Sequence, residues 1–382
     1  MRVVIAGGGT GGHIYPALAV ARSLRARPDP PELAWIGGHR GLEAGLVPPA
    51  GIPLHRLALR SLRTVDPDVH LLLDPLRLAA SVPQAAALLA RRRPAAVFTT
   101  GGYVAIPVLL AARILGIPVV LWEGNAIPGR SVRATARLAA AVAVSFEETC
   151  EALGARRCYR TGTPIRDPGA VDRPAARTRL GIPADGRLLL VFGGSQAVRR
   201  FSVAVAGALP RLVERVRVLH VTGDAGYAAA LADREALTAA VRERYRPVPF
   251  LADGMGDALA AADLLVGRAG SSTLAEAAAF GLPLVCVPYP HAAGHQRANA
   301  RALVEAGAAR LVEDEALDAD ALLAAASLLD DPVALGAMRE AALAIGRPGA
   351  ADAVAALVMA AAAGRPWPEP AEIERMARGV AA

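Results

Sequence analysis

The 382-residue sequence contains no lysine, so all 42 of its basic side chains are arginines. Carboxamides are almost absent as well: there are two asparagines, Asn125 and Asn299, and three glutamines, Gln84, Gln196 and Gln296. In a composition that excludes amides so strongly, each one that remains is a candidate for a specific hydrogen-bonding task.

Long apolar runs are also missing. No segment reaches the roughly 18–20 consecutive apolar residues of a membrane-spanning helix. The longest approach, AVAALVMAAAA at 353–363, stops at Gly364. The apolar run at the N-terminus breaks at Gly7, so we expect no signal peptide.

Cysteine is scarce too. The three cysteines, at positions 150, 158 and 286, do not have the spacing of a metal site. We therefore expect reduced thiols in a cytoplasmic protein.

Apolar residues are abundant and charge is uneven. The hydrophobic content of 54% supports large cores, and the length suits two domains of roughly 150–200 residues. Residues 1–165 hold 19 arginines against 10 acidic residues, whereas residues 166–382 hold 23 against 25. The basic first half is compatible with nucleic acid, with an anionic membrane surface, or with an ordinary solvated surface whose only cation is arginine.

Short apolar segments alternate with longer helical ones, as in β-α-β units with parallel sheets. The expected strands are 2–7, 33–38, 95–100, 119–123 and 141–146, and then 187–194, 216–223, 248–250, 262–267 and 283–289. A loop rich in Gly, Pro and Arg at 161–177 separates the two series. We therefore expect two doubly wound α/β domains that face each other across a cleft, followed by a helical tail.

The first strand runs into GGGTGGHIYP at residues 7–16. Gly7, Gly9 and Gly12 satisfy the dinucleotide pattern GxGxxG, but that site also needs an acidic residue at the end of the second strand. No Asp or Glu follows that strand before Glu43, which disfavours a nicotinamide oxidoreductase. His13 stands at a helix start, where free N–H groups favour a neutral imidazole, so it is a candidate general base. A histidine that only caps the helix is the alternative.

Two strand–turn–helix segments in the second half point to a nucleotide. FGGSQAVRR (192–200) places Ser195 at a helix N-terminus suited to phosphate. In GRAGSSTLAEAAAFGLP (267–283), Glu276 follows Thr273 by one turn and is placed to accept both hydroxyls of a ribose. The alternative, a solvated glutamate on a helix face, fits less well with its apolar neighbours.

The ordered set GGGTGGHIYP, TTGGYVA, WEGNAIPGR, TGTPIR, GGSQAVRR, RAGSSTLAEAAAFGLP and HQRANARAL resembles the motifs of the MurG family, from Met1 to about residue 345. That family transfers N-acetylglucosamine (GlcNAc) from UDP-GlcNAc to the 4-hydroxyl of N-acetylmuramic acid (MurNAc) in lipid I, which gives lipid II for peptidoglycan synthesis. The resemblance implies an inverting, metal-independent glycosyltransferase with a GT-B fold and no cofactor. Another GT-B enzyme that uses UDP-GlcNAc, such as a UDP-GlcNAc 2-epimerase, is the alternative.

The resemblance also implies an organisation and a location. It predicts an acceptor- and membrane-facing domain (1–163) and a UDP-GlcNAc-binding domain (164–345). Beyond the resemblance, we expect a helical tail (346–382) that packs back on the first domain. The resemblance predicts a peripheral protein on the cytoplasmic face of the plasma membrane, with no nucleic acid bound and with other cell-wall synthesis proteins as further partners. The apolar stretch 69–78, followed by Arg91, Arg92 and Arg93, either docks on an anionic bilayer or forms a core helix with a solvated arginine run.

Residue by residue, the resemblance implies the following roles. On the acceptor side it makes His13 the base, with Thr10, Gly11, Gly12 and Tyr103 beside it. On the donor side it implies Asn125 at the sugar, Arg166, Ser195 and Gln196 around the pyrophosphate, and Leu251 and Met255 around the uracil. It further implies that Ser271, Ser272 and Thr273 begin the donor-binding helix, that Glu276 holds the ribose, and that His295 and Gln296 read the GlcNAc hydroxyls.

Overall fold

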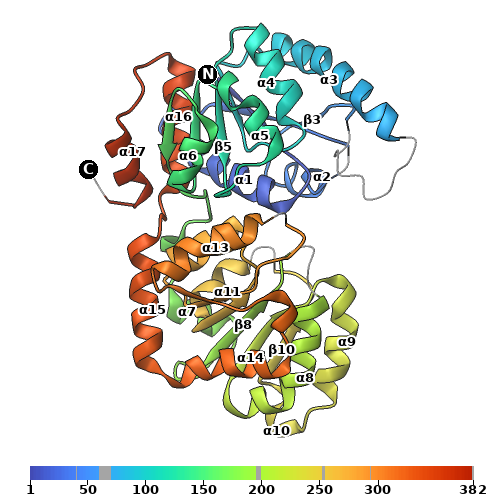
Figure 1. Ribbon diagram of the computed structural model, residues 1–382, viewed down its shortest axis with the longest axis vertical. Coiled ribbons are helices and arrows are strands. Elements are labelled where there is room, and N and C mark those ends of the chain that lie inside the picture. Colours follow the sequence, from blue (N-terminus) through green and yellow to red (C-terminus); the bar gives the residue numbers. More distant parts are fainter. Residues whose placement is uncertain (40, 60–69, 195–198, 252–253, 293, 381–382) are drawn as a thin grey trace. The chain divides into compact units, whose positions relative to one another are not determined.

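The computed structural model describes residues 1–382 except 40, 60–69, 195–198, 252–253, 293 and 381–382. Its contacts divide the chain into two compact units. Unit 1 consists of Met1–Ile165 together with Arg347–Ala382, and unit 2 is Arg166–Gly346. Each unit is built on a parallel sheet with helices packed on its faces (Figure 1).

Unit 1 contains a seven-stranded sheet in the order β3-β2-β1-β4-β5-β6-β7, in which every pair is parallel. Its strands are β1 (Arg2–Ala6), β2 (Glu32–Gly37), β3 (Leu54–Arg56), β4 (Ala96–Thr99), β5 (Val119–Glu123), β6 (Ala141–Val144) and β7 (Cys158–Arg160). Its helices are α1 (Gly11–Arg25), α2 (Glu43–Leu46), α3 (His70–Arg92), α4 (Ala105–Ile114), α5 (Arg130–Thr135), η1 (Ala136–Leu138), α6 (Glu147–Leu153), α16 (Ala350–Ala363) and α17 (Pro370–Ala377).

The sheet of unit 1 is buried on both faces, which explains its nearly continuous apolar strands. Successive side chains of a strand point to opposite faces. Val3 and Ile5 accordingly join the core under α1 and α16, whereas Val4 and Ala6 join the core under α3 and α4.

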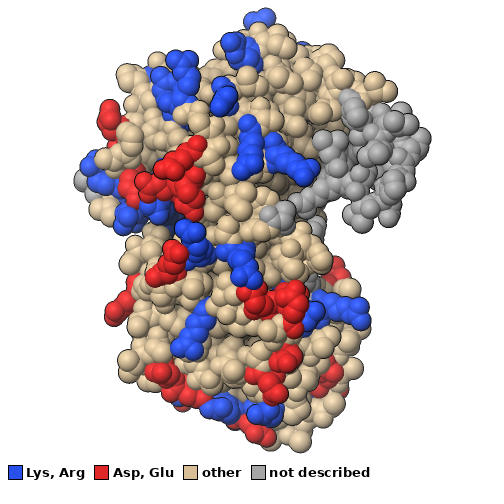
Figure 2. Space-filling model, viewed as in Figure 1, with Lys and Arg blue, Asp and Glu red and all other residues tan. Residues whose placement is uncertain are grey.

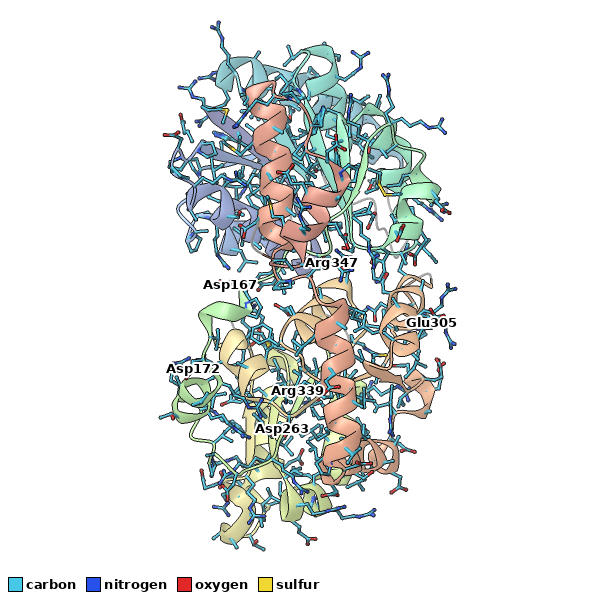
Figure 3. The ribbon with its side chains drawn as sticks, turned by 90° about the vertical axis from the view of Figure 1, so that its left-hand side faces the viewer. Asp167, Asp172, Asp263, Glu305, Arg339 and Arg347 are labelled. Carbon is cyan, nitrogen blue, oxygen red and sulfur yellow. A yellow bond between two sulfur atoms is a disulfide. The ribbon has the colours of Figure 1, made fainter. Side chains whose placement is uncertain are left out.

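The tail is part of the unit 1 core. Helix α16 packs against α1 and against β4 and β5 (Figure 1). Arg347, labelled in Figure 3, lies over Gly162 and pairs with Glu374 of α17 at 2.6 Å. Arg347 therefore holds the start of the tail against the loop that follows β7.

Unit 2 contains a six-stranded parallel sheet in the order β10-β9-β8-β11-β12-β13. Its strands are β8 (Leu188–Phe192), β9 (Arg217–Val221), β10 (Tyr245–Val248), β11 (Leu264–Gly267), β12 (Leu284–Cys286) and β13 (Ala309–Leu311). Its helices are η2 (Pro168–Ala170), α7 (Arg173–Arg179), α8 (Arg199–Arg215), α9 (Asp224–Glu235), α10 (Ala239–Arg242), α11 (Met255–Ala261), α12 (Ser271–Ala279), α13 (His295–Glu305), η3 (Asp314–Ala316), α14 (Ala319–Ala326), η4 (Ser327–Asp330) and α15 (Pro332–Ile345).

A single carboxylate ties the first helix of unit 2 to its sheet. Asp263 accepts hydrogen bonds from Arg173 at 2.5 Å and Arg177 at 3.1 Å, and also from the backbone N–H of Leu188 at 2.8 Å. Arg339 lies beside this group (Figure 3), and burial lowers the pKa of its guanidinium. The network orients α7 before the first strand of the unit.

One stretch, Pro332–Ala363, is long and apolar enough to cross a membrane, but 61% of its most apolar window is buried inside the protein. The stretch is broken into α15 and α16, which belong to different units. Its apolar character therefore reflects two core helices in succession.

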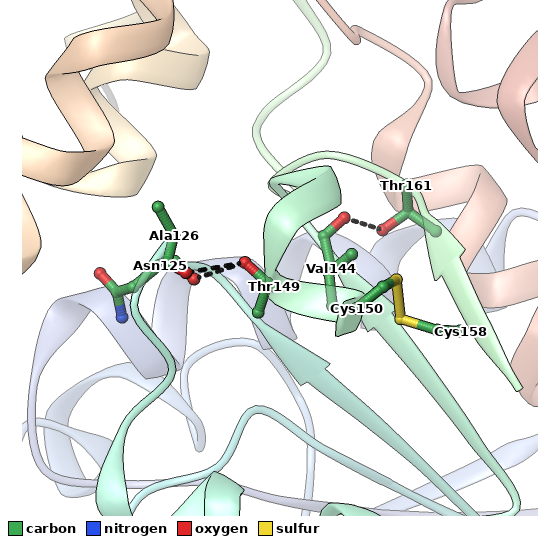
Figure 4. Close-up of a disulfide and its surroundings, with 7 residues drawn as sticks. All are labelled: Asn125, Ala126, Val144, Thr149, Cys150, Cys158 and Thr161. Atoms are coloured by element: carbon green, nitrogen blue, oxygen red, sulfur yellow. Dashed lines mark hydrogen bonds between the residues drawn. A yellow bond between two sulfur atoms is a disulfide. The ribbon is translucent and has the colours of Figure 1, made fainter. Parts of the chain in front are cut away.

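The expectation of three unpaired cysteines is wrong for two of them. Helix α6 runs back beside the sheet, so that Cys150 on α6 and Cys158 on β7 meet in a disulfide with Cα atoms 5.7 Å apart (Figure 4). Their eight-residue separation gave no sign of this because the contact depends on the helical reversal between them. Cys286 is free and buried in β12, where burial raises the pKa of its thiol to about 12.

Candidate active site

His13 lies in the first turn of α1 and is half-buried. Its Nδ1 is 2.7 Å from the carbonyl oxygen of Thr100, directly after β4, and the Thr100 hydroxyl donates back to the His13 carbonyl at 3.0 Å. A carbonyl oxygen can only accept, so Nδ1 carries the ring proton. In the neutral imidazole the basic lone pair is then on Nε2.

The other residues predicted for the acceptor side surround this histidine within unit 1. The Thr10 carbonyl accepts from His13 N at 3.1 Å and so begins the helix, with Gly11 and Gly12 in its first turn. The ring of Tyr103 lies against the same loop, because a Cβ added at Gly9 would be 3.3 Å from it. Burial, reinforced by the nearby carboxylate of Glu43, raises the pKa of the Tyr103 phenol to about 12, so this side chain stays protonated near neutral pH.

Asn125 also belongs to unit 1, in the loop that follows β5. The buried carboxylate of Glu123 accepts from the backbone N and the side-chain Nδ2 of Asn125, both at 2.9 Å, and from Gly129 N at 2.9 Å. On the other side, the Thr149 hydroxyl donates to the carbonyls of Asn125 and Ala126 (Figure 4). The loop is therefore held in place by its own carboxylate and by α6.

In unit 2, Arg166 and Glu276 form an ion pair, with Arg166 Nε 3.0 Å from Glu276 Oε1. Burial raises the pKa of the Glu276 carboxyl, and the adjacent Arg166 opposes that rise. The stem of Arg166 packs on α11, since a Cβ at Gly256 would be 3.5 Å from Arg166 Cδ. The sequence separates these two residues widely, and the fold brings them together.

Two helices of unit 2, α12 and α13, begin after the adjacent strands β11 and β12. Helix α12 begins at Ser271, so Ser271, Ser272 and Thr273 form its first turn, with Glu276 on the next. Helix α13 begins at His295, and the Gln296 side-chain oxygen accepts from Tyr289 N at 2.9 Å. This bond joins Tyr289 to the start of α13 and directs the Gln296 amide.

The remaining predicted residues fall into two groups. Met255 begins α11 and is buried in a core of unit 2, against which the half-buried Leu251 also packs. Ser195 and Gln196 lie outside the described residues. Among the residues that the structure describes, no group of three or more His, Cys, Asp or Glu side chains is placed to hold a metal ion.

Comparison with known proteins identifies both halves of the chain. The glycosyltransferase family 28 N-terminal domain matches residues 3–144, and the glycosyltransferase family 28 C-terminal domain matches residues 188–335. A UDP-N-acetylglucosamine--N-acetylmuramyl-(pentapeptide) pyrophosphoryl-undecaprenol N-acetylglucosamine transferase of Desulforudis audaxviator is 42% identical over 363 residues, which covers 93% of this chain and 96% of the relative. The enzyme of the same name from Moorella thermoacetica is 41% identical and covers 94% of this chain and 98% of its own length.

Solved structures agree. The crystal structure of MurG from Acinetobacter baumannii superimposes with a TM-score of 0.73 at 29% identity, covering 94% of this chain and 99% of that one. The chain belongs to the MurG family. Its two parallel-sheet units are the Rossmann-like domains of a GT-B glycosyltransferase.

With more distant structures, this MurG-family chain shares the fold and nothing more specific. A UDP-N-acetylglucosamine 2-epimerase described as putative, from Listeria monocytogenes, superimposes with a TM-score of 0.68 but is only 16% identical. It covers 96% of this chain and 98% of its own, so the GT-B architecture by itself does not separate transferases from epimerases.

Sequence reasoning missed two residues that shape the site of this MurG-family chain. One is Glu123, whose three accepted hydrogen bonds set the Asn125 loop. The other is Arg268, buried with its guanidinium carbon 4.9 Å from the ring centre of Phe201 and 5.2 Å from that of Tyr289. The same guanidinium pairs with Asp314 of η3 and donates to the Val287 carbonyl, so it links the end of β11 to η3 and to the loop after β12. Both are charged residues at strand ends next to glycine-containing turns, and this pattern is the signal that could have identified them.

Proposed function

We propose that this chain transfers GlcNAc from UDP-GlcNAc to the 4-hydroxyl of MurNAc in lipid I and so forms lipid II. The observation that carries the proposal is the near-complete match, at about 40% identity, to transferases whose names specify this donor and this acceptor. Both family 28 domains are present in the expected order.

The proposed reaction is one direct displacement. His13 Nε2 removes the proton from the acceptor hydroxyl, the oxygen attacks the anomeric carbon, and the bond from that carbon to the UDP oxygen breaks with inversion. The Thr100 carbonyl supports this role because it holds the proton on Nδ1 and orients the ring. In our proposal Thr10, Gly11, Gly12 and Tyr103 line the acceptor side of His13.

The proposed donor site uses the helix starts of unit 2. Glu276 accepts the ribose hydroxyls, and its partner Arg166 favours the charged form of that carboxylate and presents its guanidinium to the diphosphate. Ser195 and the first turn of α12 offer N–H and hydroxyl donors to the leaving UDP without a metal. Gln196, Leu251, Met255, His295, Gln296 and Asn125 complete the proposed contacts to the phosphates, the uracil and GlcNAc.

We also propose that the protein docks peripherally on the cytoplasmic face of the plasma membrane, where an undecaprenol-linked acceptor is anchored. Supporting this, α3 and α4 pack together and expose the large apolar side chains of Leu76, Leu110 and Ile114, and Leu115 directly after α4 is exposed as well. Exposed Arg113 lies in the last turn of α4 beside them. The space-filling view shows a largely tan surface with separate blue arginines over this part of unit 1, whereas both signs intermingle over unit 2 (Figure 2). Of the stretch 69–78, Val69 and the side chains of 70–75 lie outside the described residues.

The decisive experiment measures UDP release from UDP-GlcNAc in the presence of EDTA, with and without a short-chain lipid I analogue. Release that requires the analogue and yields the GlcNAc–MurNAc product supports the proposal. Release without the analogue, accompanied by N-acetylmannosamine or its UDP derivative, would show an epimerase instead.

A further inference from the structure

Glu43 is a buried carboxylate beneath the first glycine-rich loop, and the reaction proposed above gives it no role. It is the first residue of α2 and only 1% exposed. Its Oε2 accepts from Gly9 N at 3.0 Å, and its Oε1 accepts from Gly38 N at 2.9 Å. The neighbouring Leu42 N donates to Gly9 O at 3.3 Å, so both polar groups of the Gly9 backbone are held from α2.

Several glycines make room for this carboxylate. A Cβ added at Gly8 would lie 2.5 Å from Glu43 Oε1, and one at Gly41 would lie 2.1 Å from Oε2. A Cβ at Gly37 would lie 3.0 Å from Glu43 Cγ. A side chain at Gly8 or Gly41 would displace the Glu43 carboxylate, so these glycines, one beside each loop, leave the space that it occupies.

The two loops that Glu43 holds support two residues of the proposed acceptor site. Gly9 directly precedes Thr10, whose carbonyl begins α1 and accepts from His13 N. Gly38 lies directly against the hydroxyl of Tyr103, since a Cβ there would lie 2.4 Å from Tyr103 Oη. One carboxylate thus ties the loop after β1 to the loop after β2, and each loop supports one of these side chains.

We propose that Glu43 is a positioning residue of the transferase, which fixes the glycine-rich loop so that His13 and Tyr103 meet the acceptor. The inference rests on the proposed function. Hydrogen bonds from backbone N–H groups to a carboxylate are stronger than those between neutral partners. An amide in its place would turn an NH₂ group toward one of the two N–H donors and lose that bond.

The test is Glu43→Gln in the full chain, with Glu372→Gln, an exposed glutamate of α17, as the matched control. We expect kcat/KM for the lipid I analogue to fall at least tenfold in Glu43→Gln. The dissociation constant for UDP, measured by calorimetry, should stay within twofold because the proposed UDP site lies in unit 2. A drop confined to the acceptor distinguishes positioning from general loss of structure.

A second pair of variants keeps the carboxylate and shifts it. Gly8→Ala pushes on Glu43 Oε1, whereas Gly45→Ala in α2 meets nothing within 4 Å. We expect Gly8→Ala to lose acceptor turnover and Gly45→Ala to keep it, and this pair decides the matter if Glu43→Gln does not fold.

Two outcomes would count against different claims. If Glu43→Gln has the acceptor kinetics of the wild type, or if Gly8→Ala and Gly45→Ala are equally active, the inference is overturned. The proposed function still stands in that case, because the wild-type chain turns over the acceptor. Absence of acceptor-dependent UDP release from the wild-type chain would instead overturn the proposed function.

Discussion

The hydrogen bond between His13 and Thr100 leads to a prediction about a single side chain. Replacing His13 by alanine removes the proposed base, so we expect kcat to fall by about 10²–10⁴-fold. UDP binding should be unchanged, because His13 belongs to unit 1 and the proposed UDP contacts of Arg166 and Glu276 belong to unit 2. Single-turnover kinetics with the lipid I analogue, together with calorimetry of UDP, measure the two quantities. Turnover equal to that of the wild type would eliminate His13 as the base.

Buried His220 in β9 leads to a prediction about pH. Its Nδ1 is 2.9 Å from the Tyr245 hydroxyl, and burial lowers the pKa of its imidazole from 6.5 to about 4. Between these two values only the unfolded chain takes up the proton, so the free energy of unfolding falls as the pH falls. The slope is about 1.4 kcal/mol per pH unit, and this contribution is constant above pH 6.5.

His220→Gln should remove this part of the pH dependence. Thermal unfolding of both proteins at pH 7 and pH 5 is the measurement, and we expect the wild type to lose more stability than the variant over that interval. An equal loss in the two proteins would show that His220 does not titrate in this range on unfolding.

At the scale of elements, the disulfide joins α6 to β7. Closing a loop of this length stabilises the folded chain by about 2–3 kcal/mol, because it restricts the unfolded chain. The Cys150→Ser/Cys158→Ser double variant should therefore melt at a lower temperature than the oxidised wild type. A dithiol reductant should lower the melting temperature of the wild type to that of the variant and leave the variant unchanged. Identical melting of all samples would show that the bond contributes nothing.

The helix pair α3 and α4 leads to a prediction about membranes. Leu76 is 67% exposed and Ile114 is 72% exposed, so glutamates there leave the core intact but oppose an anionic apolar surface. We expect Leu76→Glu/Ile114→Glu to lose most sedimentation with anionic phospholipid vesicles. The control is Val333→Glu on α15 of unit 2, a site that is 81% exposed. Equal binding of both variants would place the docking surface elsewhere.

At the scale of the whole molecule, the tail completes the core of unit 1. Val354, Leu357 and Val358 of α16 are fully buried there, together with Ile373 of α17. A chain that ends at Gly346 should therefore expose the α1 face of the first sheet and lose the unfolding transition of unit 1. A chain that ends at Val380 should behave like the wild type. Limited proteolysis and calorimetry distinguish them, and a stable unit 1 in the shorter chain would contradict this role of the tail.

The sequence predicts the central strands better than the edges. Strands β1, β2, β4, β5, β6, β8, β9, β11 and β12 coincide with the expected apolar runs within a few residues, because strands covered on both faces are apolar throughout. The strands missed, β3, β7 and β13, are three-residue edge strands that read LHR, CYR and ARL. Each carries an exposed arginine, so its sequence resembles a loop. The edge strand β10 begins three residues before its expected start and contains Pro247.

Composition and motif order by themselves determined the class of this protein. Apolar runs between glycine turns specify parallel α/β units, and the ordered motifs specify the family. Both are encoded in neighbouring residues, where burial and turn geometry act on a few positions at a time.

Only the tertiary structure decided the contacts between distant segments. It joined Cys150 to Cys158, paired Arg166 with Glu276, and placed Glu43 beneath the loop that follows β1. No local pattern marks these partners, because each contact depends on where the sheet order brings two chain segments together. Gly8 of the first loop is legible in the sequence, but the carboxylate for which it leaves room becomes visible only when β1 and β2 lie side by side.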